Sequence, residues 1–354
     1  MSDKPKVYVA GIGMITPVGF NADMTAAAVR AGVSGYTISG YKNWACKPIT
    51  MATVPDEALP GICDDLDTSE AISVQIGRML MMATIALEQV LEFYPDDKPL
   101  PLMLAVPESD PELEVPMSHA FIELLMTQTN IALDRANCRM IGAGRAGVIA
   151  GIDMAVKYLG QGVSDYVLVG GVDSYQDHDV LLKLAEQDRV MAEGSQEGFV
   201  PGEAAGFLLL TGKKNLAQQF GKYKIGISVP GLAQEVGHMY SEATYTGEGL
   251  ANAVRTALDN HAGSRVNRIY SSMNGEHFWA KEHGVAMIRN TAELNELVTT
   301  EHPADCFGDI GAAMGAVLIG IAGLTLVKEG KAQSSLVYCS SDRAPRGAVC
   351  LELV

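Results

Sequence analysis

The chain has 354 residues, of which 48% are hydrophobic, 19% charged and 6% aromatic, and 26 Lys plus Arg against 42 Asp plus Glu give a formal charge of −16. This length can bury a substantial core in one large domain or in two fused halves, and the composition excludes disorder, collagen and coiled coil. The acidity argues against nucleic acid and against an anionic membrane surface as partners, because both attract basic patches.

The N-terminal apolar run predicts a buried strand that leads into a turn. In MSDKPKVYVAGIGMITPVG the run is too short, and too interrupted by Gly and Pro, for a signal peptide or a membrane span. The cysteines are scattered, without a CxxC pair or the spacing of metal ligands; they are Cys46, Cys63, Cys138, Cys306, Cys339 and Cys350. We therefore expect reduced thiols in a cytoplasmic protein, with no metal and no cofactor.

Short apolar runs alternate with longer runs of small residues along the whole chain. The apolar runs predict strands at Val7–Ala10, Leu102–Val106, Tyr166–Val169, Gly206–Leu210, Ile225–Val229, Arg268–Ser271, Leu336–Cys339 and Ala348–Leu351. The longer runs predict helices at Asn21–Ala31, Ala71–Phe93, Met117–Met126, Gly147–Leu159, Gly247–Asn260, Ala280–Asn295 and Ala312–Lys328. This alternation is typical of an α/β protein with largely parallel sheets covered on both faces.

Two segments, Gly147–Leu159 and Ala312–Gly323, are rich in Gly and Ala and almost free of charge. Because Gly costs a helix about 1 kcal/mol relative to Ala, its repeated use indicates very close packing. We expect one of these helices at the centre of each half of the chain. The polar stretch Gly212–Lys222 between them is interpreted as a helical connector, which gives an N-terminal half at 1–221 and a C-terminal half at 222–354.

Four segments, in order, resemble the β-ketoacyl-acyl-carrier-protein synthases, which are condensing enzymes of the thiolase superfamily. They are VYVAGIGMITPVG from Val7, GVIAGIDMAVKYLGQGVSDYVLVGGVDS from Gly147, DRVMAEGSQEGFVPGEAAGFLLL from Asp188 and GDIGAAMGAV from Gly308. The resemblance covers essentially the whole chain. It implies a thiolase-like fold of two similar halves, layered α-β-α-β-α, with the two glycine-rich helices buried at the centre.

The resemblance also locates the positions that carry catalysis in that family, a Cys at the start of the first buried helix and two His from the second half. The first falls on Arg145, and the His positions fall on Asn274 and on Asp309, or on Gly308 in a shifted alignment. Cys138 lies upstream of the helix in an expected strand, which would point its thiol elsewhere.

Other candidate groups near these positions are interpreted as structural. We expect His277 and His302 to be loop residues, and Pro303 or Ala304 stands where the family has a Lys. In the C-terminal loop SSDRAPRG, Pro345 has no N–H to donate to an oxyanion. This pattern resembles a condensing enzyme without its Cys-His-His triad.

Arg145 cannot act as a nucleophile, because its guanidinium stays protonated. In the favoured interpretation it pairs with Asp309, with Asn274 as a hydrogen-bonding neighbour and Glu203 or Glu276 as further candidates, and these five residues form the candidate pocket. In the alternative, Arg145 clamps a carboxylate of a bound ligand.

The sequence thus favours a non-catalytic relative of the synthases, acting as a partner or scaffold subunit like a chain length factor, in a homodimer or in a heterodimer with an active paralogue. The alternative is an active acyltransferase, decarboxylase or β-ketoacyl synthase with a site reorganised around Arg145, Asn274 and Asp309. A module that binds acyl carrier protein is less favoured, because such carriers are themselves acidic. The basic residues that could still support it are Lys213, Lys214, Lys222 and Lys224.

Overall fold

The computed structural model describes residues 6–66, 72–108, 120–195, 197–330 and 333–354. Its helices are α1 (Ala22–Arg30), α2 (Val74–Leu91), α3 (Ala120–Thr129), α4 (Gly147–Gly160), α5 (His178–Glu186), α6 (Glu248–Asn260), α7 (His277–Arg289), α8 (Ala304–Phe307) and α9 (Met314–Glu329). Its strands are β1 (Lys6–Ile15), β2 (Tyr36–Lys42), β3 (Pro48–Ala52), β4 (Leu102–Ala105), β5 (Arg139–Ile141), β6 (Val167–Ser174), β7 (Glu203–Thr211), β8 (Ile225–Ser228), β9 (Gly231–Gln234), β10 (Val266–Ser271), β11 (Leu294–Glu301), β12 (Ser334–Ser340) and β13 (Pro345–Leu353).

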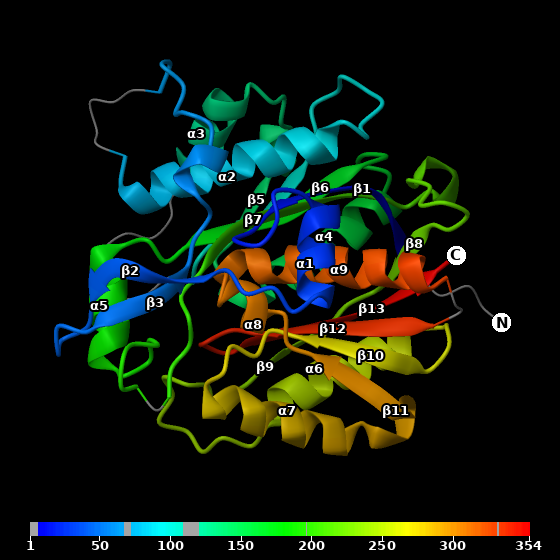
Figure 1. Ribbon diagram of the computed structural model, residues 1–354. Helices are drawn as coiled ribbons and strands as arrows, with labels where there is room; N and C mark the ends of the chain where they lie inside the picture. The colour runs from blue at the N-terminus through cyan, green and yellow to red at the C-terminus, as the bar shows by residue number, and fades with distance from the viewer. Residues whose placement is uncertain (1–5, 67–71, 109–119, 196, 331–332) are drawn as a thin grey trace.

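These elements stack in five layers (Figure 1). Helices α2 and α3 cover one outer face, helices α6 and α7 cover the other, and α4 and α9 lie between the two parts of the sheet. The expected thiolase-like α-β-α-β-α arrangement with two central helices is therefore confirmed.

The two halves of the sheet repeat one pairing pattern. In the first half the order is β5-β4-β6-β7-β1, and in the second it is β11-β10-β12-β13-β8, with β1 and β8 joined edge to edge. In both halves the first two ladders are parallel and the next two antiparallel. The expectation of largely parallel sheets is wrong, because the strands nearest the junction reverse direction.

Close approach of backbones explains the glycine content of the central layer. A Cβ on Gly171 of β6 would lie 2.0 Å from the carbonyl oxygen of Ala312, at the start of the α9 segment. A Cβ on Gly315 would lie 2.8 Å from Cβ of Val148 in α4. The central helices therefore pack on each other and on the sheet at distances that larger side chains would prevent.

Several predicted elements differ from the structure. The stretch Gly212–Lys222 is not a helical connector, since it contains a single 3₁₀ turn at Lys214–Leu216. The helix predicted at Ala280–Asn295 starts at His277 and ends at Arg289, and strand β11 begins at Leu294. Ala71 and residues 117–119, the predicted starts of two helices, lie outside the described residues.

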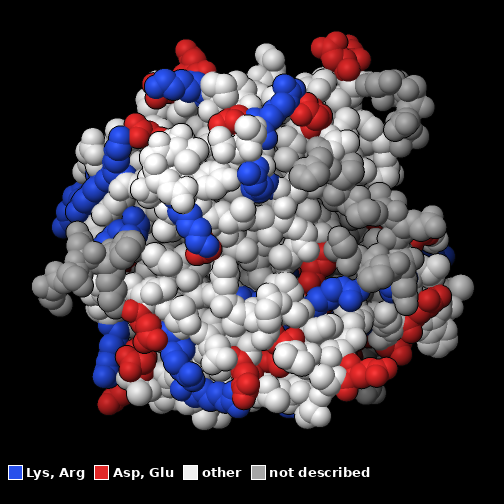
Figure 2. Space-filling model, turned by 180° about the vertical axis from the view of Figure 1, so that it is seen from behind, with Lys and Arg blue, Asp and Glu red and all other residues white. Residues whose placement is uncertain are grey.

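Two helical segments have the length and hydropathy of membrane spans, but both pack within the layers. Val74–Leu91 has a mean hydropathy of 1.2 and is 50% buried, and Gly311–Glu329 has a mean hydropathy of 1.8 and is 83% buried. Gly311–Glu329 has this character because it is enclosed in the central layer, whereas α2 lies in an outer layer and buries the face that packs on the sheet. On the face seen in Figure 2, basic and acidic side chains are interspersed around a largely uncharged centre.

Candidate functional site

Each central helix is entered through the same kind of turn. Gly144 begins the 3₁₀ turn Gly144–Ala146 before α4, and Gly311 begins the turn Gly311–Ala313 before α9; both have φ of +49°. A left-handed backbone of this kind favours glycine. The turn in the first half places Arg145 at the start of α4, with its side chain pointing into the space between the halves.

Arg145 is 3% exposed and is held by the second half of the chain. Its Nε donates to Oδ2 of Asp309 at 2.9 Å, and Nη2 donates to the same oxygen. Its Nη1 donates to Oδ1 of Asp342 at 2.8 Å and to the carbonyl of Ser340 at 3.2 Å. Despite the opposing effect of burial, these two carboxylates raise the pKa of Arg145 well above its usual value. The cation is therefore paired within the protein.

The contacts continue into a closed ring of six side chains, which we call the ion-pair ring: Arg145, Asp309, Asn274, Glu276, Arg189 and Asp342. Asn274 Nδ2 joins Asp309 at 2.8 Å and Glu276 at 3.0 Å. Arg189 joins Oε1 of Glu276 at 2.7 Å and Oδ2 of Asp342 at 2.8 Å. Although burial opposes it, Arg145 and Arg189 lower the pKa of Asp342.

The two halves contribute opposite charges to the ring. Both cations, Arg145 and Arg189, come from the N-terminal half, and the three carboxylates and the amide come from the C-terminal half. Trp279 of α7 closes one side, since its ring lies 5.1 Å from the Arg145 guanidinium and its indole N–H donates to Glu276 at 3.0 Å. The ring therefore fastens the halves together at the position where the resemblance locates catalysis.

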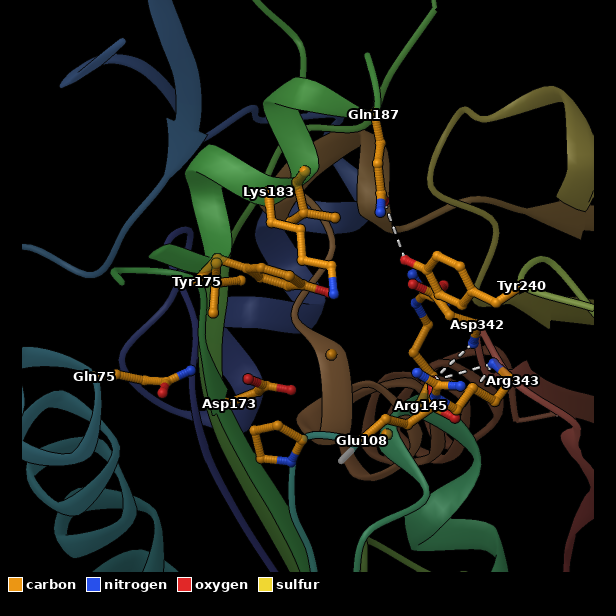
Figure 3. A pocket seen from close by; sticks show the side chains of 15 residues that line it. Gln75, Glu108, Arg145, Asp173, Tyr175, Lys183, Gln187, Tyr240, Asp342 and Arg343 are labelled. Carbon is orange, nitrogen blue, oxygen red and sulfur yellow. Dashed lines mark hydrogen bonds and ion pairs between the residues drawn. The ribbon is translucent and has the colours of Figure 1, made fainter. Parts of the chain in front are cut away.

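A cavity of about 130 Å³ lies beside the ring (Figure 3). Its lining includes Glu108 and Asp173, with Tyr175, which directly follows β6, and Lys183 of α5 projecting over them. Burial, with a contribution from Asp342, raises the pKa of Glu108 to about 7. Burial also raises the pKa of Asp173 to about 7, although the Ala312 N–H donates to this carboxylate at 2.8 Å. Two carboxyl groups of this cavity therefore titrate near neutral pH.

The structure brings four of the five candidate pocket residues together and leaves Glu203 outside. Glu203 is fully buried in a separate ion pair, 2.6 Å from Nη2 of Arg78 in α2, and it also accepts from Ser174 and from the Val54 N–H. This carboxylate anchors α2 and the segment after β3 to the sheet, because its partners come from both.

The other candidate groups also lie apart from the ring. Cys138 directly precedes β5 and is buried in the outer core beneath α2 and α3, where burial raises its pKa. His277 is exposed and pairs with Glu197 at 3.0 Å, and His302 contacts Oγ of Ser271 at 2.8 Å. In the described part of the chain, no three His, Cys, Asp or Glu side chains are placed to hold a metal ion.

Sequence reasoning missed Arg189, Asp342, Glu108 and Asp173. Arg189 and Asp342 lie inside two segments that the resemblance singled out, DRVM and SSDRAPRG, so those motifs are the signal for them. Glu108 has no comparable signal: its carboxylate faces the site because it accepts the Asp342 N–H at 2.9 Å.

Comparisons with known proteins find relatives of this fold. The family model described as "Beta-ketoacyl synthase, N-terminal domain" matches residues 140–215, a segment that contains both ring cations. Among solved structures, the ishigamide ketosynthase/chain length factor matches with a TM-score of 0.76 at 14% identity, covering 99% of each chain.

The chain has the thiolase-like fold of the ketosynthases, and its residues 140–215 resemble their N-terminal domain.

Two further structures support this fold. A ketosynthase in complex with its chain length factor from Xenorhabdus doucetiae has a TM-score of 0.75 at 14% identity, covering 99% of this chain and 98% of that one. The ketosynthase from module 6 of the bacillaene synthase from Bacillus subtilis 168 has a TM-score of 0.77 at 13% identity, covering 99% and 72%. No curated protein matches the sequence. The family match spans α4, β6, α5 and β7, which are the elements that position Arg145, Asp173 and Arg189.

Proposed function

We propose that this protein is a non-catalytic partner subunit for an active condensing enzyme of the same fold, in the manner of a chain length factor, in fatty-acid or polyketide type metabolism. The proposal rests on the burial and the hydrogen bonding of the Arg145 side chain. The residue at the nucleophile position is a buried guanidinium whose donors are engaged by Asp309, Asp342 and the Ser340 carbonyl. Such a group neither attacks a thioester nor is free to hold one.

The thiols of the chain support the same proposal. Cys339 on β12 is fully buried and interacts electrostatically with Arg145 and Asp309. Burial raises the pKa of its thiol, although the Arg145 guanidinium opposes the shift. Condensing enzymes need a thiolate, which a raised pKa disfavours. Pro345, which the sequence places in a loop and the structure makes the first residue of β13, also offers no N–H for an oxyanion.

The sheet provides a surface on which a partner of the same fold can continue the layers. Among the described residues, β5 is the terminal strand of the first-half sheet and pairs with β4 alone. Two of the similar solved structures are a ketosynthase/chain length factor and a ketosynthase in complex with its chain length factor. We propose a heterodimer with an active paralogue, with a homodimer as the weaker form, and we retain the division into halves at 1–221 and 222–354.

Carrier binding has weaker support from the surface lysines. Lys213 pairs with Asp165 at 2.5 Å, and Nζ of Lys224 donates to the carbonyl of Lys214 at 2.6 Å. Part of the expected basic patch is therefore engaged within the protein, which leaves acyl carrier protein a less favoured partner. All six cysteines are free thiols in the structure, which supports a cytoplasmic location.

A catalytic role is the second candidate, and one observation favours it. Glu108 and Asp173 line the cavity with pKa values of about 7, which suits general acid–base work at neutral pH. Arg145, Asn274 and Asp309, in contrast, are saturated by one another. A decarboxylase or acyltransferase would therefore depend on the two cavity carboxyls rather than on the ring.

Covalent labelling separates the two candidates. The protein is incubated with an acyl thioester or a cerulenin-type electrophile, beside an active condensing enzyme as positive control, and the intact mass is measured. We expect a full adduct on the control and none on this protein. A stoichiometric adduct on Cys339 or another cysteine overturns the non-catalytic assignment.

Native mass spectrometry tests the partner. The protein is co-expressed with an active condensing enzyme from a neighbouring gene and also purified alone. We expect one copy of each chain in the complex. The variant Arg139→Pro in β5 should abolish complex formation. The variant Ser335→Pro, in the interior of the sheet, should abolish folding itself. Purification only as a homodimer in the presence of the enzyme contradicts the heterodimer.

A further inference from the structure

The loop between β12 and β13 points two consecutive backbone N–H groups at a single carboxylate. The Asp342 N–H donates to Oε2 of Glu108 at 2.9 Å, and the Arg343 N–H lies 3.4 Å from both oxygens of that carboxylate. Consecutive N–H groups that converge in this way form an anion-binding concavity, called a nest. The nest belongs to the C-terminal half, whereas Glu108 follows β4 in the N-terminal half. One half therefore places a carboxylate in an anion site of the other.

A glycine makes room for the Glu108 side chain beside the first central helix. A Cβ on Gly144, in the turn before α4, would lie 2.8 Å from Cγ of Glu108 and 3.4 Å from its Oε2. The Glu108 side chain therefore runs directly over the backbone of this turn to reach the loop. A side chain at position 144 would displace the carboxylate from the nest.

The ionised form of Glu108 is poorly stabilised in the nest. Burial, followed by the carboxylate of Asp342, raises the pKa of Glu108 to about 7, although Arg145 and the two loop N–H groups oppose the shift. A raised pKa means that the charged form, relative to the protonated form, is less favourable here than in water. Departure of the ionised side chain into solvent therefore costs little free energy.

The cavity beside the ion-pair ring adjoins the nest. Glu108, Asp342 and Arg343 all line it, and its volume is about 130 Å³. Helix α5 lies across the cavity from Glu108 in Figure 3, and its residues Val180 and Leu184 also line the space. A cavity of about 150 Å³ engineered in another protein binds benzene, so this space admits a molecule of about six heavy atoms. A ligand that reaches the nest must therefore be small, with a short apolar part.

We propose that the nest of Asp342 and Arg343 is a binding site for a short-chain carboxylic acid, and that Glu108 occupies it as a displaceable internal ligand. The carboxyl group of the acid accepts from the two loop N–H groups in place of Glu108, and its alkyl chain lies in the cavity. A doubly charged phosphate is disfavoured, because the Asp342 carboxylate already opposes a single negative charge in the nest. The site is independent of the partner role proposed above, because all of its groups come from one chain.

Exchange at the nest acts on the ion-pair ring through Asp342. The backbone N–H of this residue forms part of the nest, and its side chain accepts from Arg145 and from Arg189, each at 2.8 Å. Glu108 joins the two halves covalently to the site it fills, whereas a bound acid contacts the loop without such a tether. Binding therefore releases one link between the halves and leaves the ion pairs of the ring in place.

Amide chemical shifts of the wild-type chain test displacement directly. The full chain, deuterated and labelled with nitrogen-15, is titrated with sodium butyrate at neutral pH and constant ionic strength. We expect the amide signals of Asp342 and Arg343 to move and to saturate, and sodium phosphate to leave them in place. Signals that stay unmoved throughout the butyrate titration, or that move equally with phosphate, overturn the proposal.

Removal of the internal ligand tests the site separately from its occupant. In Glu108→Ala butyrate should bind at least about tenfold more tightly than in wild type, where only the fraction of molecules with Glu108 displaced can bind it. Glu108→Gln keeps an acceptor oxygen in the same side chain and should bind butyrate no more tightly than wild type. Glu123→Ala removes an exposed carboxylate and should match wild type.

The readout for these variants is the rise of the thermal midpoint with butyrate concentration, since a ligand that binds the folded state stabilises it. The largest rise should belong to Glu108→Ala. An equal rise in Glu108→Ala and Glu123→Ala overturns the proposal. If Glu108→Ala does not fold, the amide titration of the wild-type chain decides alone.

Discussion

Removal of the Asp309 carboxylate should be among the most destabilising single changes in the chain. Asp309 has no exposed surface, and it accepts hydrogen bonds from Arg145 at 2.9 Å, from Asn274 at 2.8 Å and from the Gly311 N–H at 2.9 Å. In Asp309→Ala the buried guanidinium keeps only Asp342 as a charged partner, and Asp342 is shared with Arg189. Breaking a buried pair by removing one partner costs about 3–5 kcal/mol, and we expect a loss in that range.

The double variant Arg145→Met/Asp309→Leu should be much less destabilised. It removes both charges and replaces them with apolar groups, and such replacements of buried pairs are often neutral. The coupling free energy between the two sites should therefore be at least about 2 kcal/mol in favour of the pair.

The assay is urea denaturation of wild type, Asp309→Ala, the two single variants Arg145→Met and Asp309→Leu, and the double variant, followed by far-ultraviolet circular dichroism and tryptophan fluorescence. Coincident transitions by the two probes establish a single unfolding step. The control Glu123→Ala removes an exposed partner of Arg135 and should leave the midpoint unchanged. A midpoint for Asp309→Ala equal to that of the control, or a double variant as unstable as the sum of the singles, would refute the reasoning.

The remaining predictions concern titration, backbone strain and thiol exposure. Burial raises the pKa of Asp173 to about 7 in the folded protein, so the folded state binds this proton more tightly than the unfolded chain does. The contribution of this group to the free energy of unfolding therefore falls as the pH rises from about 4 to 7. Asp173→Asn should therefore raise the urea midpoint relative to wild type at pH 8 and lose that advantage at pH 4; a constant difference would count against the shift. Gly311→Ala should lower stability by about 2 kcal/mol or more, because φ is +49° and the Cβ would lie 1.9 Å from Oδ2 of Asp173, whereas Gly40→Ala meets nothing within 4 Å and should be tolerated in the same thermal melt. Titration of the native protein with a disulfide reagent should modify exposed Cys46 first and half-buried Cys63 next, with the four buried thiols reacting only after unfolding; rapid reaction of Cys339 would indicate an open site.

Apolar periodicity determined the scaffold well. The apolar runs of β4 and β8 and the small-residue runs of α4 and α9 lie where they were predicted, because a strand or helix buried on both sides must be apolar along its length. Strand direction was not determined in this way, because the same apolar run serves a parallel or an antiparallel ladder. Helix α5 was missed although Asp177 caps it and its apolar positions recur at helical spacing.

Some residues of the site could likewise be predicted from the sequence, whereas others were found only in the structure. The sequence alone located Arg145, Asn274 and Asp309, since their positions follow from motifs at fixed offsets, and it anticipated that a buried Arg needs a carboxylate. It also named Asp309 as the favoured partner, and the structure shows that pair. The second carboxylate, Asp342, was decided by the tertiary structure. Glu203 forms its ion pair with Arg78 of α2 instead. Arg189 and Asp342 are 153 residues apart in the chain, yet their side chains lie 2.8 Å apart and complete the ring. Pairing of this kind depends on how two folded halves face each other, and no local pattern of residues encodes that distance.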